Sequence, residues 1–299
     1  MNVGGGRAAV ALLALAACTD IADDGTPWQD AAEVVGTEVG PAPTLRAASG
    51  CTLRIASWNV HFLPDPQDLL AHLRASREIA NADVILLQET STWPGDERSR
   101  TAGLADQLAM TWAHTPVVEL PNGVYQGNGI LSRFPLERVA VKRLPYIARP
   151  AFDQARTALA ADIVVGDQRV RVVSVHLDVR VQITDAIRQL DPAVTDLDER
   201  AVVGGDFNTA PWQWVDGVVP LTSTEAVVGM KQAAILDDYM ASRRYQSAIS
   251  PDTNTFTLPG FGMRLDNVYP RAIPLLDAGV EHVGGSDHWP IYADVDLCN

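Results

Sequence analysis

The chain has 299 residues, of which 47% are hydrophobic and 20% are charged, a composition that supports a large buried core and excludes general disorder. Lys and Arg total 23 against 37 Asp and Glu, so the formal net charge is −14 and no cationic field covers the whole protein. This charge lowers the expectation of a nucleic-acid substrate without excluding one, because a bound cation can supply local positive charge.

The first 17 residues have the features of an export signal. Arg7 precedes an apolar run over residues 8–17, which has the length of a signal-peptide hydrophobic region and is too short to span a bilayer. The run ends in Leu-Ala-Ala-Cys, which resembles the lipobox of bacterial lipoproteins, where Cys18 would receive lipid. We therefore expect residues 1–17 to be a lipoprotein signal peptide and the chain to be exported and membrane-anchored, in the periplasm or on the cell surface. The alternative is a plain signal peptide followed by an unrelated cysteine.

Residues 18–50 are predicted to form a flexible acidic tether, because they are rich in Ala, Gly, Pro, Asp and Glu and lack sustained apolar periodicity. The rest of the chain, residues 51–299, has no second low-complexity break and is predicted to be one large domain. Cys51 and Cys298 flank this domain, and an oxidising compartment would allow them to pair as a disulfide. We expect a monomer.

Short apolar runs bounded by turn residues predict buried strands, and two segments with helical spacing predict covering helices. The strands are expected at 53–58, 84–88, 129–132, 170–176 and 201–205, and the helices at 68–80 and 102–110. Strands dominate after residue 127, which fits neither a parallel α/β sheet nor an all-β sandwich. The predicted fold is α/β, a four-layer α-β-β-α sandwich in which two mainly antiparallel sheets pack face to face with helices outside.

Polar side chains follow several of these strands, at the point where each strand ends. A strand end on a rigid sheet can hold such a group at a cleft. Because a lone histidine or glutamate at a strand end is usually structural, the hypothesis of a single site depends on the whole set. The set comprises Asn59, Glu89, His176, Asp206, Asn208, Asp266, Asp287 and His288.

These residue types suit hydrolysis of a phosphate ester with a hard divalent cation. Mg²⁺ prefers carboxylates, water and substrate phosphate, and Glu89 with Asn59 could provide such an incomplete shell. Hydrolysis also needs an activated water, donors to the phosphoryl oxygens and a group that acts on the leaving oxygen. The sequence has neither the Cys/His spacing of structural zinc sites nor a Walker phosphate loop.

The motifs around these residues resemble those of the endonuclease/exonuclease/phosphatase superfamily, which has the DNase I-like fold. The resemblance covers essentially residues 52–297, and it lies in the order of the motifs more than in any single one. The motifs are Ser-Trp-Asn at 57–59, Leu-Gln-Glu at 87–89, Gly-Asn-Gly-Ile-Leu-Ser at 127–132, Val-His-Leu at 175–177, Gly-Asp-Phe-Asn at 205–208, Leu-Asp at 265–266 and Ser-Asp-His at 286–288.

The resemblance implies a role for each matched position. Glu89 would bind the metal, Mg²⁺ with Mn²⁺ or Ca²⁺ as alternatives, with Asn59 beside it and Asp287 on the metal side. Asp206 and Asn208 would orient the attacking water and the scissile phosphate.

The resemblance also assigns the histidines and one arginine. His288 would be the general base or a phosphate-contacting imidazole, paired with Asp266, and His176 would act on the leaving-group side. Arg156, in Ala-Arg-Thr at 155–157, takes the place of an arginine that contacts phosphate in several relatives.

Nearby polar residues have ordinary explanations. Asn128, between two glycines, is expected to support a turn, and Asp178 with Arg180 is expected to form an exposed ion pair.

The expected function is divalent-metal-dependent hydrolysis of a phosphodiester by in-line attack of water. Nucleic acid and a phospholipid-type headgroup are both open as substrates, and a lipid anchor would hold the enzyme close to the latter. An alternative of a different class is a catalytically inactive, surface-binding lipoprotein of the same fold. The retained metal, base and acid positions argue against it, because a binding module does not need all of them.

Overall fold

The computed structural model describes residues 21–22, 26–41, 50–61, 65–147, 154–195, 197, 200–210, 213–215, 219–221, 232–257 and 262–298. The predicted signal peptide and Cys18 lie outside these residues. Within them, no helix is both long enough and apolar enough to cross a bilayer.

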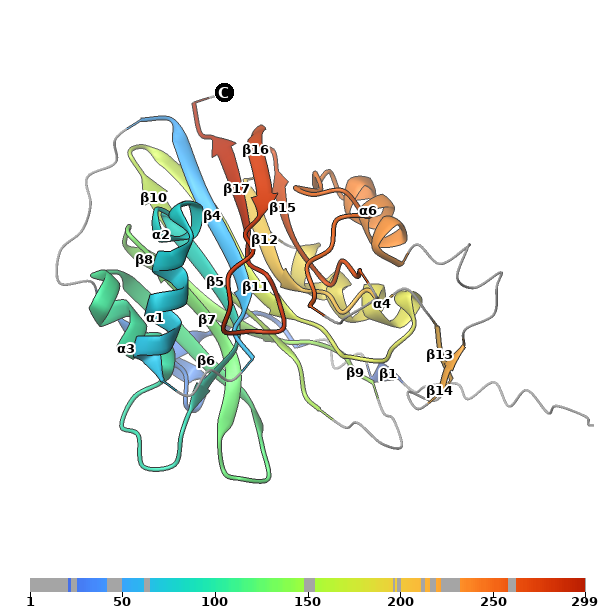
Figure 1. Ribbon diagram of the computed structural model, residues 1–299, viewed down its shortest axis with the longest axis horizontal. Helices are drawn as coiled ribbons and strands as arrows, with labels where there is room; N and C mark the ends of the chain where they lie inside the picture. The colour runs from blue at the N-terminus through green and yellow to red at the C-terminus, as the bar shows by residue number, and fades with distance from the viewer. Residues whose placement is uncertain are drawn as a thin grey trace, which may run out of the picture.

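Two large mixed sheets form the centre of the protein (Figure 1). Sheet I has the order β16 (Leu275–Val280), β17 (Ile291–Asp296), β4 (Thr52–Asn59), β5 (Val84–Thr92), β7 (Tyr125–Ser132), β6 (Thr111–Glu119) and β3 (Glu38–Gly40). Sheet II has the order β15 (Asp266–Arg271), β12 (Ala201–Asp206), β11 (Gln168–His176), β10 (Thr157–Val165), β8 (Leu136–Arg143) and β2 (Gln29–Asp30). The pairs β4–β5 and β11–β12 are parallel, and the other pairs in these sheets are antiparallel.

Helices cover the outer face of each sheet, on opposite sides of the molecule in Figure 1. Helices α1 (Pro66–Ala75), α2 (Arg77–Ala80) and α3 (Arg100–Leu108) share an apolar cluster with sheet I. Helices α4 (Ile183–Val194) and α6 (Gln232–Ser242) share another with sheet II, and a third cluster fills the space between the sheets. The predicted four-layer α-β-β-α sandwich is therefore confirmed.

The helix expected at 68–80 is interrupted at Ser76. This residue ends α1 in an extended conformation, and its hydroxyl accepts a hydrogen bond of 3.1 Å from the Ile79 backbone N–H, which makes it the N-cap of α2. Serine competes in this way with the helical backbone, and such competition is why it favours caps over helix interiors.

The segment between Gln29 and Gly40 differs from the flexible tether expected at 18–50. Strand β2 pairs with β8 in sheet II, the 3-10 helix η1 (Ala31–Glu33) follows, and β3 pairs with β6 in sheet I. The segment therefore crosses from one sheet to the other along one side of the sandwich. Its composition gave no sign of this, because short edge strands are held by backbone hydrogen bonds that most residue types can make.

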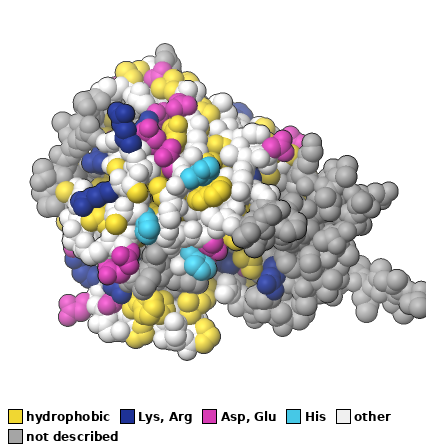
Figure 2. Space-filling model, in the orientation of Figure 1, with side chains coloured by type: hydrophobic (Ala, Val, Ile, Leu, Met, Phe, Trp, Pro, Cys, Tyr) yellow, Lys and Arg dark blue, Asp and Glu magenta, His cyan; other side chains and the backbone are white. Residues whose placement is uncertain are grey.

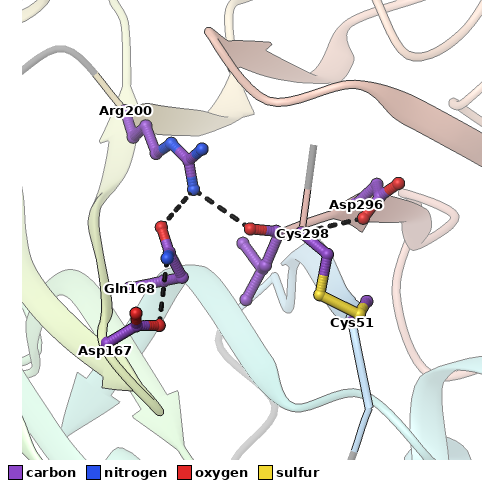
Figure 3. The surroundings of a disulfide bond; sticks show 7 residues. Cys51, Asp167, Gln168, Arg200, Asp296 and Cys298 are labelled. Atoms are coloured by element: carbon purple, nitrogen blue, oxygen red, sulfur yellow. Dashed lines mark hydrogen bonds between the residues drawn. A yellow bond between two sulfur atoms is a disulfide. The ribbon is translucent and has the colours of Figure 1, made fainter.

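Two small two-stranded sheets lie outside the sandwich, β1 (Ile21–Ala22) with β9 (Tyr146–Ile147) and β13 (Gln213–Val215) with β14 (Val219–Leu221). The predicted pair Cys51 and Cys298 is joined by a disulfide next to the end of β17 (Figure 3). Beside it, Arg200 donates hydrogen bonds to the Gln168 side chain and to the Leu297 carbonyl oxygen.

Candidate active site

The polar residues predicted at strand ends face the gap between the two sheets. Side chains alternate between the faces of a strand, so Asn59 shares the inner face of β4 with the core residue Ile55. His176 ends β11 and Asp206 ends β12, and the parallel register makes them neighbours. The antiparallel register of β12 with β15 makes Asp206 the neighbour of Asp266. Strand pairing therefore brings together residues that are up to 90 positions apart, from His176 to Asp266.

Beneath these residues, a polar contact joins the two sheets. Gln88 on β5 donates a hydrogen bond of 3.0 Å to the Ser174 hydroxyl on β11, and Ser174 donates one of 3.0 Å to the Leu87 carbonyl oxygen. Gly204 on β12 permits this close approach, since a Cβ there would lie 2.8 Å from the Leu86 side chain. The floor of the site is thus fixed by packing and by hydrogen bonds.

Glu89 reaches the site only because β5 is irregular. Regular alternation would direct its side chain away from Gln88 and toward the helices, yet Glu89 has a φ of +57° and the β5–β7 register shifts between Leu87 and Thr90. A bulge of this kind redirects a side chain, and left-handed φ values in residues other than glycine cluster at functional sites. His61 and Asn208, with φ values of +43° and +51°, share this feature.

Asn59 is buried and connects two carboxylates. Its Nδ2 donates to Glu89 Oε1 at 3.1 Å and to Asp206 Oδ2 at 2.9 Å, while its Oδ1 accepts a bond of 3.0 Å from the His61 backbone N–H. Asn59, predicted as a metal ligand, thus turns its amide nitrogen toward the carboxylates and its oxygen away. This geometry orients Glu89 and Asp206.

His288 is held by Asp266, as predicted. The distance from His288 Nδ1 to Asp266 Oδ2 is 2.8 Å, and Thr255 donates a bond of 2.8 Å to the same oxygen. Burial lowers the pKa of His288, but the carboxylates of Asp266 and Asp206 outweigh burial and raise it to about 10. The Phe256 ring lies edge-on at 5.0 Å between centroids and restricts the orientation of the imidazole.

Asp206 lies between the two imidazoles. Its Oδ2 is 3.5 Å from Nε2 of His176 and 3.7 Å from Nε2 of His288. Burial raises the pKa of Asp206 to about 7, although the charge of His288 and hydrogen bonds from Asn208 and Asn59 act in the opposite direction. Asn208 donates its backbone N–H to Asp206 Oδ1 at 2.9 Å and its side-chain Nδ2 to the Leu177 carbonyl oxygen at 2.9 Å.

His176 is supported on its other side by buried charges. Arg156 Nη1 lies 3.2 Å from His176 Nδ1, and Arg156 Nε donates a bond of 3.1 Å to Asp178 Oδ1. Because Arg156 can only donate, Nδ1 of His176 is the acceptor and its Nε2 carries the proton toward the site. Burial lowers the pKa of His176 well below its usual value, and the positive charges of Arg156 and His288 lower it further.

Two expectations in this region are wrong. Asp178 is fully buried and bonded to Arg156 and Gln189, so it does not form an exposed ion pair. Asn128 is buried within β7 and donates a bond of 2.8 Å to the Thr157 carbonyl oxygen of β10, so it joins the sheets instead of supporting a turn. Flanking residues gave no sign of either position, because burial is decided by the opposite sheet.

Sequence reasoning missed His61. Its Nδ1 lies 3.4 Å from Asp287 Oδ1 and 3.8 Å from Glu89 Oε2, and its side chain is 52% exposed. It therefore connects Asp287 with Glu89 at the open edge of the site. Its position two residues after Asn59 was the available signal, but the left-handed turn that directs it there cannot be read from residue type.

The residues present fit a divalent cation. The carboxylates of Glu89 and Asp206 each offer a ligand atom, and these atoms lie within 4.8 Å of one another. Among the described residues, three buried atoms of the site have no hydrogen-bond partner, namely Glu89 Oε2, His176 Nε2 and Asp266 Oδ1. Buried polar atoms are costly when unpaired, so these atoms suit a bound ion or substrate. The carboxylate oxygens match the preference of Mg²⁺.

Comparison with known proteins agrees with this geometry. The profile of the Endonuclease/Exonuclease/phosphatase family matches residues 56–288, which include the predicted polar site residues from Asn59 to His288. No curated protein matches the sequence.

Solved structures share the fold at low identity. An endonuclease/exonuclease/phosphatase from Beutenbergia cavernae has a TM-score of 0.64 and 22% identity, over 83% of this chain and 72% of that one. TDP2 of D. rerio, solved with a single strand DNA product, has a TM-score of 0.53 and 16% identity, over 82% and 99%. ANGEL2, a 2',3'-cyclic phosphatase, has a TM-score of 0.54 and 15% identity, over 85% and 99%. The chain therefore belongs to the Endonuclease/Exonuclease/phosphatase family and has its DNase I-like α/β sandwich.

Proposed function

We propose that the protein is a divalent-cation-dependent phosphoesterase that hydrolyses phosphodiesters. The observation that carries this proposal is the position of Asp206 between two imidazoles, beside Glu89, with unpaired buried atoms around the same space. Buried, unpaired donors and acceptors are costly unless a ligand satisfies them, so they support a site that binds a phosphate group or a cation. Membership of the family supports the same reaction class.

In this reaction, water forms a new P–O bond as the ester P–O bond breaks on the opposite side. Asp206 orients the attacking water and accepts its proton, with Asn208 beside it. Nε2 of His288 donates to a phosphoryl oxygen, because Asp266 holds Nδ1 of the same ring. Nε2–H of His176 donates to the departing oxygen, which takes up a proton from solvent. Glu89, with Asp287 on the same side, would hold a divalent cation whose charge stabilises the phosphoryl oxygens.

The scissile group is a phosphodiester, carried by nucleic acid or by a lipid headgroup. TDP2 with its DNA product is a precedent for nucleic acid on this fold. However, the net charge is −14, and on the face shown in Figure 2 Lys and Arg side chains are scattered among acidic and neutral ones. A track for a nucleic-acid backbone would need clustered cations.

The protein is further proposed to be an exported monomer attached to a membrane through lipid on Cys18. The support is the sequence around Cys18, which lies outside the described residues. In a bacterial host, labelling with a fatty-acid analogue and membrane fractionation should detect lipid on the wild-type protein and none on Cys18→Ser. Equal labelling of both would contradict the anchor.

The proposed activity is tested with bis(p-nitrophenyl) phosphate, plasmid DNA and phospholipid vesicles, each with Mg²⁺, Mn²⁺, Ca²⁺ or EDTA. At least one substrate should be hydrolysed with a cation and not in EDTA. Glu89→Ala and His288→Ala should each lower turnover by about 10²–10⁴-fold. Glu137→Ala, at an exposed surface position, is the matched control. Absence of cation-dependent turnover on every substrate would favour the inactive binding protein.

A further inference from the structure

A cavity of about 530 Å³ lies beside the segment that crosses from β2 to β3. This volume is within the range of about 300–1,000 Å³ that small-molecule sites occupy. Its walls come from that crossing segment, from β6, from β8 and from the start of β10. The lining residues are Gln29, Glu33, Val34, Val35, Thr115, Pro116, Val117, Val141, Arg143, Leu144, Tyr146, Ala155, Arg156 and Thr157.

The wall from the crossing segment is firmly attached to sheet I. Gly36 has a φ of +79° and packs so closely that a Cβ there would lie 2.9 Å from Pro116. The hydroxyls of Thr37 and Thr115 are 3.0 Å apart, and Glu38 accepts two hydrogen bonds from Ser99, of 3.1 and 3.2 Å. These contacts fix the segment on β6 and on the N-cap of α3, so the cavity is a built feature of the fold.

The cavity adjoins the candidate active site. A smaller pocket shares Val117, Arg156 and Thr157 with it and is also lined by His176. Arg156 Nη1 contacts His176 Nδ1 at 3.2 Å. The cavity therefore starts beside His176, next to the Nδ1 side of its ring.

The lining favours an apolar occupant. Eight of the fourteen lining side chains are apolar, and three of these are exposed, Val35 at 96%, Tyr146 at 37% and Ala155. Tyr146 is the single aromatic side chain in the lining, and Arg143 and Arg156 are its basic ones. Arg156 is already bonded to Asp178. A nucleic-acid strand would need stacking platforms and several free cations, whereas an alkyl chain needs apolar surface alone.

We propose that this cavity binds an alkyl or acyl chain carried by the phosphodiester. The inference rests on the proposed function, and it narrows the substrate class to amphiphilic phosphodiesters. Each methylene group buried there is worth about a fourfold gain in affinity, by the transfer free energy of one CH₂.

The test compares two substrates, methyl and octyl esters of p-nitrophenyl phosphate, with Mg²⁺. The wild-type protein should have a kcat/KM at least tenfold higher for the octyl ester. The double variant Val35→Asp, Tyr146→Ser should lose that preference and keep wild-type activity on the methyl ester. Val39→Asp, 51% exposed and outside the cavity lining, is the charge-matched control and should behave like the wild type. Equal kcat/KM for both esters in the wild type would overturn the inference.

A binding measurement separates this inference from the proposed function. Calorimetry in EDTA should detect octylphosphonate binding to the wild type and to Val39→Asp, with at least tenfold weaker binding to the double variant. If octylphosphonate binds with this pattern but no phosphodiester is hydrolysed, the inference about the cavity stands and the proposed function is wrong. If the methyl ester is hydrolysed but octylphosphonate does not bind, the proposed function stands and the inference about the cavity is wrong. If a dinucleotide binds and octylphosphonate does not, the cavity is a nucleic-acid site.

Discussion

His176 and Asp206 are neighbours across the parallel pair β11–β12, and Nε2 of His176 lies 3.5 Å from Oδ2 of Asp206. Each residue ends its strand, so both side chains are held by the rigid part of the sheet and face the same space. A catalytic pair fixed in this way keeps its geometry without help from a loop.

Asp206→Asn should lower kcat by about 10²–10⁴-fold, because the amide cannot accept the proton of the attacking water. The fold should tolerate this change well. Burial raises the pKa of Asp206, so the folded state disfavours its charge. Steady-state kinetics and thermal unfolding in EDTA measure the two effects, with Asp106→Asn at an exposed site as control. A large fall in Tm would show that Asp206 is structural.

Asp178→Asn should destabilise the protein by about 3–5 kcal/mol, because it leaves Arg156 as a buried charge without its ionic partner. Turnover should also fall, since Arg156 would no longer hold His176. Urea unfolding and kcat report these effects, and Asp167→Asn on the surface should change neither. Unchanged stability would mean that the Arg156–Asp178 pair contributes little to the fold.

His114 should make stability depend on pH. Burial lowers the pKa of His114 to about 3, and its Nε2 has no hydrogen-bond partner among the described residues. Between pH 6.5 and pH 3 the unfolded chain therefore binds a proton at this residue that the folded chain does not. As the pH is lowered through this range, His114 decreases the free energy of unfolding by about 1.4 kcal/mol per pH unit. Above pH 6.5 both states are neutral and the contribution vanishes. Urea unfolding of the wild type and of His114→Gln across this range measures the free energy of unfolding as a function of pH. Its slope should be shallower in the variant by that amount, and equal slopes would contradict the prediction.

Gly36→Ala should destabilise the protein by about 1–3 kcal/mol, because its φ is +79° and the added Cβ would lie 2.9 Å from Pro116. Gly166→Ala is a matched control, since Gly166 has a φ of +64° and open space around its Cβ position. Gly166→Ala should lower the free energy of unfolding only by the cost of a left-handed backbone conformation, about 1 kcal/mol. Chemical denaturation compares the two. No effect of Gly36→Ala would mean that residues 29–40 detach from the sheets in solution, as a tether would.

Local sequence was sufficient to predict the main buried strands and the polar residues at their ends. Apolar runs predicted β4, β5, β11 and β12, and period-two alternation carries Asn59, His176 and Asp206 to the inner face without further information. The motif order then indicated the family, which the profile match over 56–288 shows directly.

Features that depend on a distant part of the chain were not predictable. Asp178 is buried because Gln189 and Arg156 surround it, and residues 29–40 are ordered because β8 and β6 offer free strand edges. Glu89 and His61 reach the site through left-handed turns, which residue type does not reveal outside glycine.

The sequence by itself determined which chemistry-bearing residues exist and on which face of which strand they lie, because side-chain alternation is a local property of the backbone. Only the tertiary structure decided which of them meet, which charges are buried together and where a cavity opens beside His176. Those outcomes depend on strand register and on packing between the two sheets, and both are set by contacts between segments far apart in the chain.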